Sequence, residues 1–125
     1  MDLTRIFKSD KEGIRRSHVK NLVAVALADG QLMDAEWQLL VRIGVQLGIS
    51  EAETMRIKNN PDSVMFIAPK THEERVQQIE DLVSIISIDR DINPLEVELC
   101  KKISLRLDVL PQIVDSIIAR ITNAS

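Results

Sequence analysis

The sequence predicts an all-α fold, a single helical domain of two pseudo-repeated αα-hairpins with short flanking helices. Its 125 residues suffice for one domain, and 45% of them are hydrophobic and 28% charged, as in ordinary globular proteins. Helix-capping side chains precede several amphipathic segments. Residues 21–49 also align without a gap on residues 81–109, which lie 60 positions later.

This alignment pairs side chains of the same kind. Apolar residues meet apolar residues at helical spacing, acidic residues meet acidic residues, and Gly44 meets the equally small Ser104. The principal pairs are Leu22 with Leu82, Asp29 with Asp89, Glu36 with Glu96, Leu39 with Leu99, Ile43 with Ile103, and Leu47 with Leu107. We therefore expect two copies of one unit, about residues 10–58 and 71–121, inside one domain that spans residues 1–125.

Start and stop signals delimit the helices of each unit. A capping box pairs a Ser or Thr with a Glu three residues later, and Gly is typical after a helix end. In chain order we predict helices over about residues 10–28 (Ser9 to Glu12), 34–47 (ending at Gly48), 51–59 (Ser50 to Glu53), 72–88 (Thr71 to Glu74), 94–108 (Asn93 with Pro94 and Glu96) and from Pro111 onward.

Two of these helices contain almost wholly apolar segments, "LVAVALA" and "LVSIISI". Helices that are apolar on all sides tend to be central and buried. The β-branched run "LVSIISI" could instead form a strand, although the preceding cap favours a helix. Residues 59–70 contain two prolines and are expected to form a short helical turn or an ordered loop across the bundle.

Acidic side chains gather at the two predicted hairpin turns. Each turn has an Asp at the end of one helix and a Glu seven residues later, in the first turn of the next helix. Oxygen-rich clusters suit hard divalent cations such as Ca²⁺ or Mg²⁺. The candidate metal ligands are Asp29, Asp34, Glu36, Asp89, Asp91 and Glu96.

A structural role for the same residues stays open. Asp29 and Asp89 could simply accept N–H bonds from the start of the next helix, and Glu36 and Glu96 stand where a capping-box Glu belongs. The acidic turns would then be only helix caps of a plain protein-interaction domain.

Several function classes find little support. A net charge of −3 and 2% aromatic residues disfavour nucleic-acid binding. The single Cys100 allows no internal disulfide and indicates a reducing compartment, and neither a signal peptide nor a transmembrane segment is expected. His18 and His72 lack metal-pair spacing, and Cys100 is expected to be an inert core thiol, although a Cys100–His site stays open. We expect neither catalysis nor an organic cofactor; an enzyme that uses the carboxylates as acid and base is the remaining rival.

The segment "KEGIRRSHVK" is the densest basic run of the chain. Arg15, Arg16 and Lys20 could touch phosphate or an acidic partner, but such a run is usually a solvated face or pairs within the molecule. Trp37 could anchor a partner, and we expect it to be half-buried against the first helix.

The stretch "ALADGQLMDAEWQLLVRIGVQLGISEAE" resembles the tellurite-resistance TerB family, as do "MFIAPKTHEERVQQIEDL" and "DRDINPLE". The resemblance covers about residues 10–120. It implies an all-helical fold with an internal pseudo-repeat and a cytoplasmic protein with a cation-binding acidic patch. It also implies links to tellurite and chemical-stress systems that work near the membrane, through protein partners. The family's acidic positions correspond to Asp29, Glu36, Asp89 and Glu96, with Asp34 and Asp91 as neighbours.

Two positions depart from the family pattern. Arg90 stands in the second turn where the first has Gly30, and Met33 stands where a polar N-cap is expected. Both bear on whether this chain binds metal.

Overall fold

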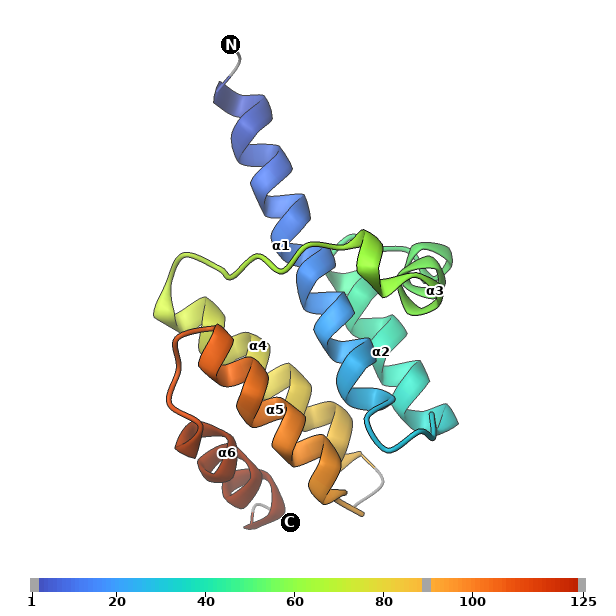
Figure 1. The fold of residues 1–125 in the computed structure, drawn as a ribbon, viewed down its shortest axis with the longest axis vertical. Coiled ribbons are helices and arrows are strands. Elements are labelled where there is room, and N and C mark those ends of the chain that lie inside the picture. Colours follow the sequence, from blue (N-terminus) through green and yellow to red (C-terminus); the bar gives the residue numbers. More distant parts are fainter. Residues whose placement is uncertain (1–2, 89–90, 124–125) are drawn as a thin grey trace.

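The computed structural model describes residues 3–88 and 91–123, which form six α-helices and one 3-10 helix and contain no strand (Figure 1). In chain order these are α1 (Leu3–Ala26), α2 (Asp34–Gln46), α3 (Glu51–Asn59), η1 (Pro61–Ser63), α4 (His72–Ser87), α5 (Pro94–Arg106) and α6 (Gln112–Asn123). The all-α prediction is confirmed. The strand alternative for "LVSIISI" is wrong, because this segment belongs to α4 up to Ser87.

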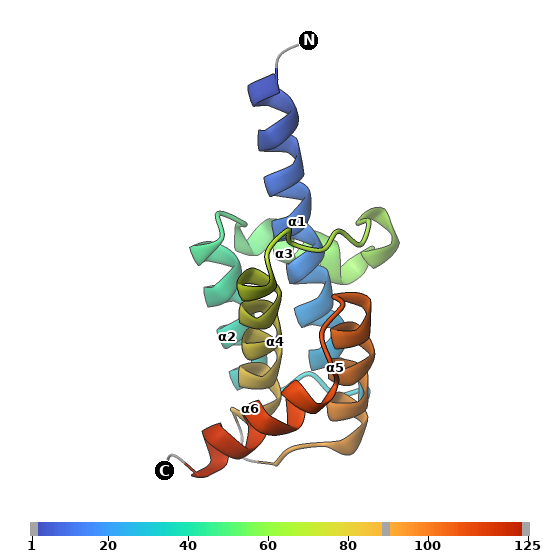
Figure 2. The ribbon, with the colours of Figure 1, turned by 90° about the vertical axis from the view of Figure 1, so that its left-hand side faces the viewer.

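The two helices with wholly apolar segments lie at the centre of the bundle, as predicted. α1 packs against α2, α3, α4 and α5, and α4 also packs against α2, α5 and α6 (Figures 1 and 2). Among the residues whose burial is described, they supply half of the buried apolar side chains, which are Val19, Leu22, Val23, Val25 and Ala26 from α1 and Ile79, Leu82, Val83, Ile85 and Ile86 from α4. Both halves of the chain therefore share one core.

The predicted start of the first helix near residue 10 is wrong. α1 begins at Leu3 and passes through Ser9, so the Ser9 to Glu12 pattern does not mark a helix end. The preceding segment "LTRIFK" contains mostly residues that a helix accepts at little cost, and the helix continues through it. This N-terminal part of α1 projects beyond the other helices in both views (Figures 1 and 2).

Two other capping predictions are confirmed. Ser50 Oγ accepts a hydrogen bond from the backbone N–H of Glu53 at 3.2 Å. Thr71 Oγ1 accepts one from the backbone N–H of Glu74 at 3.2 Å and donates one to the Glu74 carboxylate at 2.8 Å. α3 and α4 therefore begin where the sequence indicates.

α2 and α5 begin and end 60 positions apart, in agreement with the offset of the sequence alignment. Two residues after each helix end, the backbone adopts a left-handed conformation, at Gly48 with φ 84° and at Asp108 with φ 59°. Each also closes with the backbone bond that typifies this kind of helix end. The closing bonds run from Ile49 N to Gly44 O (2.8 Å) and from Val109 N to Ser104 O (3.0 Å). Superposition of the two complete units stays a prediction.

The connection between α3 and α4, residues 60–71, begins with η1, as the expected short turn, and then crosses α1 (Figure 1). Three side chains of α1 and α4 hold its backbone. The bonds are Lys20 Nζ to Val64 O (2.8 Å), Ile67 N to Ser17 Oγ (2.9 Å) and Arg75 Nε to Pro69 O (2.7 Å).

Candidate functional site

Asp29 lies in the turn after α1, as predicted, and its two oxygens have different partners. Oδ1 accepts a hydrogen bond from the backbone N–H of Gln31 at 2.9 Å. This bond closes the turn itself, three residues before α2 begins at Asp34. The N-cap position of α2 is held by Met33, which makes no side-chain capping bond. Asp29 is therefore a turn residue and does not cap the next helix, so the capping alternative is wrong for this residue.

The second oxygen of Asp29 reaches the other hairpin. Its Oδ2 accepts a hydrogen bond from Asn93 Nδ2 at 3.4 Å. Asn93 caps α5, as predicted, because its Oδ1 accepts from the backbone N–H of Leu95 at 2.8 Å. The turn after α1 and the N-cap of α5 thus meet at one end of the bundle. The backbone N–H of Gln31 and the side-chain amide of Asn93 offset part of the Asp29 charge.

Glu36 and Glu96 occupy the third positions of α2 and α5, and both are buried. Glu36 is 2% exposed and Glu96 is 4% exposed. Glutamate is seldom buried to this degree, because a desolvated carboxylate is costly unless other groups compensate for it. Sequence spacing placed both residues at the acidic turns, but it did not indicate that they would be core residues.

The remaining candidate ligands are either exposed or outside the described residues. Asp34 and Asp91 are exposed to solvent. Asp89 and its neighbour Arg90 lie outside the described residues. Within the described part of the chain, no group of three or more His, Cys, Asp and Glu side chains is arranged to hold a metal ion.

Cys100 faces the core, where it is fully buried and forms no disulfide. Burial, and to a smaller degree the nearby charge of Glu96, raises the pKa of the Cys100 thiol from 9.0 to about 12. A thiol with this pKa stays protonated at neutral pH, which is consistent with the inert core role expected from its alignment with Leu40.

Two side chains of the basic run bond within the molecule. Arg16 pairs with Glu53 of α3 at 2.9 Å, and Lys20 holds the 60–71 connection. Trp37 is half-buried, as expected, and Lys58 lies 5.8 Å from its ring centroid.

One polar site was missed by the sequence reasoning. His18 of α1 is 2% exposed, and its Nε2 lies 2.8 Å from Asp81 Oδ2 of α4. The two residues are 63 positions apart, so no local spacing reveals the pair. His18 and Gln78 also lie outside the aligned segments 21–49 and 81–109, so the internal repeat gave no signal for this pair.

Comparison with known proteins connects this geometry to a family. A family model described as "Tellurite resistance protein TerB" matches residues 1–59, the segment that contains α1, α2 and α3. Over this segment the chain is similar to the TerB family. No curated protein and no solved structure matches it. The TerB match includes the first acidic turn, with Asp29, Asp34 and Glu36, whereas the second turn lies outside the matched segment.

Among the described residues, every helix is too short or too polar to span a lipid bilayer.

Proposed function

We propose that this TerB-like protein is a non-enzymatic domain of the tellurite-resistance type, and that its two acidic turns together bind a divalent cation, Ca²⁺ or Mg²⁺. The observation that carries the proposal is the contact between the turns, in which Asn93 donates to Asp29 across 64 positions of sequence. Acidic residues from both turns are thereby brought to the same end of the bundle.

The burial of Glu36 and Glu96 supports a role beyond helix capping. A capping-box Glu serves its helix equally well from the surface, yet both of these carboxylates are desolvated. Crowded carboxylates repel one another, and a bound cation relieves this repulsion. The proposed ligands are Asp29, Glu36, Asp89 and Glu96, with Asp34 and Asp91 at the edge of the site. Because the described residues alone do not form a metal site, the proposal depends on Asp89.

The non-enzymatic part of the proposal is supported by the state of the one cysteine. Cys100 is buried, and its pKa is raised to about 12, so it is not available as a nucleophile at neutral pH. We place the domain in the cytoplasm, where it acts through protein partners, including stress complexes at the membrane. The net charge of −3 does not favour nucleic acid as a partner.

Thermal melts with CaCl₂, MgCl₂ or MnCl₂, against NaCl at matched ionic strength, test the cation site. A ligand that binds only the folded state raises Tm, and raises it further as its concentration increases. We expect this rise in the wild-type protein and its loss in the double variant Asp29→Asn with Asp89→Asn. The variant Glu12→Gln with Asp62→Asn removes two exposed charges outside the turns and should keep the rise.

The rival function is a plain interaction domain whose acidic turns are only structural. A wild-type Tm that no divalent ion changes beyond the effect of NaCl would favour this rival and contradict the cation site. In that case the Asp29 substitution should still lower stability, by about 1 kcal/mol for a weakened turn hydrogen bond.

A further inference from the structure

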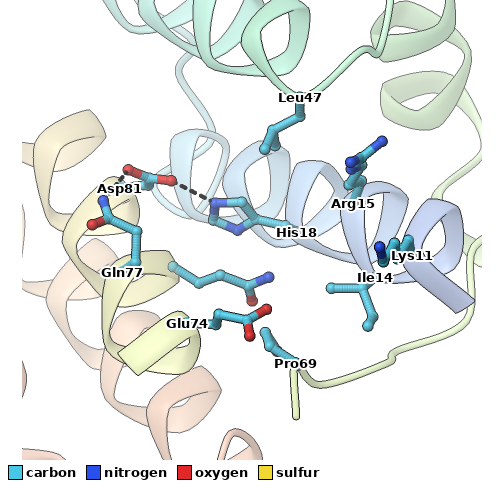
Figure 3. A pocket seen from close by; sticks show the side chains of 10 residues that line it. Lys11, Ile14, Arg15, His18, Leu47, Pro69, Glu74, Gln77 and Asp81 are labelled. Atoms are coloured by element: carbon cyan, nitrogen blue, oxygen red, sulfur yellow. Dashed lines mark hydrogen bonds and ion pairs between the residues drawn. The ribbon is translucent and has the colours of Figure 1, made fainter. Parts of the chain in front are cut away.

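A pocket of about 340 Å³ opens between α1 and α4, away from the acidic turns (Figure 3). One face of each helix lines it, at the spacing i, i+3, i+4, i+7 that puts side chains on the same side of a helix. These faces run from Lys11 to His18 on α1 and from Glu74 to Asp81 on α4, and Leu47 and Pro69 close the sides.

The floor of this pocket is a histidine held in one orientation. His18 Nε2 lies 2.8 Å from Asp81 Oδ2, and Gln77 Nε2 donates to the other oxygen of Asp81 at 3.3 Å. Because an ionised carboxylate only accepts hydrogen bonds, Nε2 carries the proton of this bond. Asp81 thereby fixes the orientation of the imidazole ring and places its proton on Nε2.

The other ring nitrogen of His18 is buried and has no hydrogen-bond partner in the described part of the chain. Figure 3 shows it turned away from Asp81, toward the side of the pocket where Glu74 and Pro69 lie. A buried polar atom without a partner costs free energy, and nearly all such atoms in folded proteins are satisfied. Nδ1 of His18 is therefore an unsatisfied polar atom beside the pocket, available to a ligand group that displaces the side chains covering it.

The charges that remain unmatched around this pocket are positive. Lys11 and Arg15 are exposed and form no hydrogen bond or ion pair with a described residue. The two acidic residues are already engaged, Glu74 by Thr71 and Asp81 by His18. An anionic group fits beside the two cations, and an Arg matches the two oxygens of a carboxylate particularly well.

Part of the wall is apolar, formed by Ile14, Leu47 and Pro69, and Gln78 adds a polar side chain. Pockets that combine an apolar wall with a few fixed polar groups typically bind small organic molecules. We propose that this pocket binds a small organic hydroxycarboxylate. Its carboxylate lies against Arg15 and Lys11, its carbon chain lies against the apolar wall, and its hydroxyl bonds to Nδ1 of His18. A hydroxyl suits this position because it can donate to the neutral ring and accept from the protonated ring.

Nitrogen NMR of the histidine rings, titrated with 3-hydroxybutyrate, tests the proposal. The chain has two histidines, and the exposed His72 reports on general effects of salt and pH. We expect a saturable shift of the His18 Nδ1 resonance while the His72 resonances stay in place. Butyrate, which lacks the hydroxyl, should bind about tenfold more weakly, as expected for one lost hydrogen bond. Butanediol, which lacks the carboxylate, should give no saturable shift.

A pair of neighbouring arginines provides the matched control. Arg15→Gln removes a cation from the pocket and should weaken 3-hydroxybutyrate binding about tenfold. Arg16→Gln removes the cation that pairs with Glu53 and should leave the affinity unchanged. Both side chains are exposed, so neither substitution disturbs the core. A His18 resonance that does not respond, equal binding by the two variants, or equal binding of inorganic phosphate would overturn the proposal.

Discussion

At the scale of single residues, burial decides how the one cysteine reacts. The Cys100 thiol has a pKa of about 12 in the folded protein, compared with the ordinary value of 9.0, mainly because of burial. Only the thiolate is the nucleophile in thiol reactions. In the folded state the reactive form is therefore scarce at pH 8, and the core also shields the sulfur from reagents.

We expect Cys100 to react with an aromatic disulfide reagent at pH 8 only when the protein unfolds. The rate in denaturant should be at least about a hundredfold above the native rate, because both access and the thiolate fraction increase. As pH rises, the unfolded thiol should reach half of its full rate near its ordinary pKa of 9.0, whereas the native thiol should still react slowly there. Absorbance of the released reagent measures this. A fast native reaction would show that the thiol is accessible and ionised.

Two adjacent acidic residues of α4 differ in how much their partners depend on them. Asp81 holds the buried imidazole of His18, whereas Glu80 pairs on the surface with Arg120 at 2.8 Å. Asp81→Ala leaves His18 without its acceptor, and we expect a loss of about 1–3 kcal/mol in the free energy of unfolding. Glu80→Ala removes an exposed pair and should cost less than about 1 kcal/mol. Urea denaturation of both variants gives the comparison, and equal losses would contradict a special role for the buried pair.

At the scale of elements, the close approach of α2 to α3 depends on a residue without a side chain. A Cβ atom added at Gly44 would lie 3.1 Å from Thr54 Oγ1 of α3 and 3.5 Å from the carbonyl oxygen of Ile49. At the corresponding position of α5, the Ser104 hydroxyl donates to the carbonyl of Val109 at 2.7 Å. A close helix contact is therefore present at Gly44, and a small hydroxyl side chain is accommodated at the equivalent position of α5.

Gly44→Leu should overpack this contact and destabilise the protein by about 1–3 kcal/mol. Gly44→Ser is the matched control and should cost less, since its hydroxyl can repeat the bond that Ser104 makes. Thermal melts of both variants measure the difference. A melt unchanged by Gly44→Leu would mean that the helices separate without cost.

Local signals predicted most element boundaries, but not the long-range contacts. The capping interactions of Ser50, Thr71 and Asn93 depend on residues two or three positions away, so the sequence contains all that is needed. The predicted start of α1 was wrong, because the capping pattern of Ser9 and Glu12 lies inside a longer helix. Residues 3–8, before Ser9, are also helical, so the pattern does not mark a helix end there. The His18–Asp81 pair could not be foreseen, because it depends on which faces of two central helices meet.

The same limit applies to the candidate metal site. Spacing correctly placed Asp29 in a turn, but its bond to Asn93 joins two hairpins and depends on their packing. The burial of Glu36 and Glu96 likewise results from how the helices pack, since a third helical position is as often exposed.

At the scale of the whole molecule, the family match covers only residues 1–59, whereas the hydrophobic core includes residues from both halves of the chain. The TerB match ends at residue 59, yet α1 packs along α4, which belongs to the other half of the chain. The buried residues Leu22 and Val25 of α1 lie in the same core cluster as Leu82 and Ile85 of α4. The matched segment is therefore not a separate folding unit.

We expect a fragment of residues 1–60 not to fold cooperatively, because it would expose the apolar face that α1 buries against α4. Circular dichroism during thermal denaturation should show weak helicity and no sharp transition, whereas the full chain should melt cooperatively. Mixing the fragment with residues 61–125 should restore the transition if the shared core is the cause. A sharp transition of the isolated fragment would contradict this view.

The hydrogen bonds that hold residues 60–71 affect how readily proteases cleave the chain. This connection is at the surface, and its Met65 is 77% exposed, so an unattached segment of this kind would be cut readily. Its anchor Ser17, however, is 1% exposed and lies in the middle of α1. Cleavage requires residues 60–71 to detach from this buried anchor, so the rate of cutting follows the free energy of releasing the segment from α1 and α4 and not the mobility of a free loop.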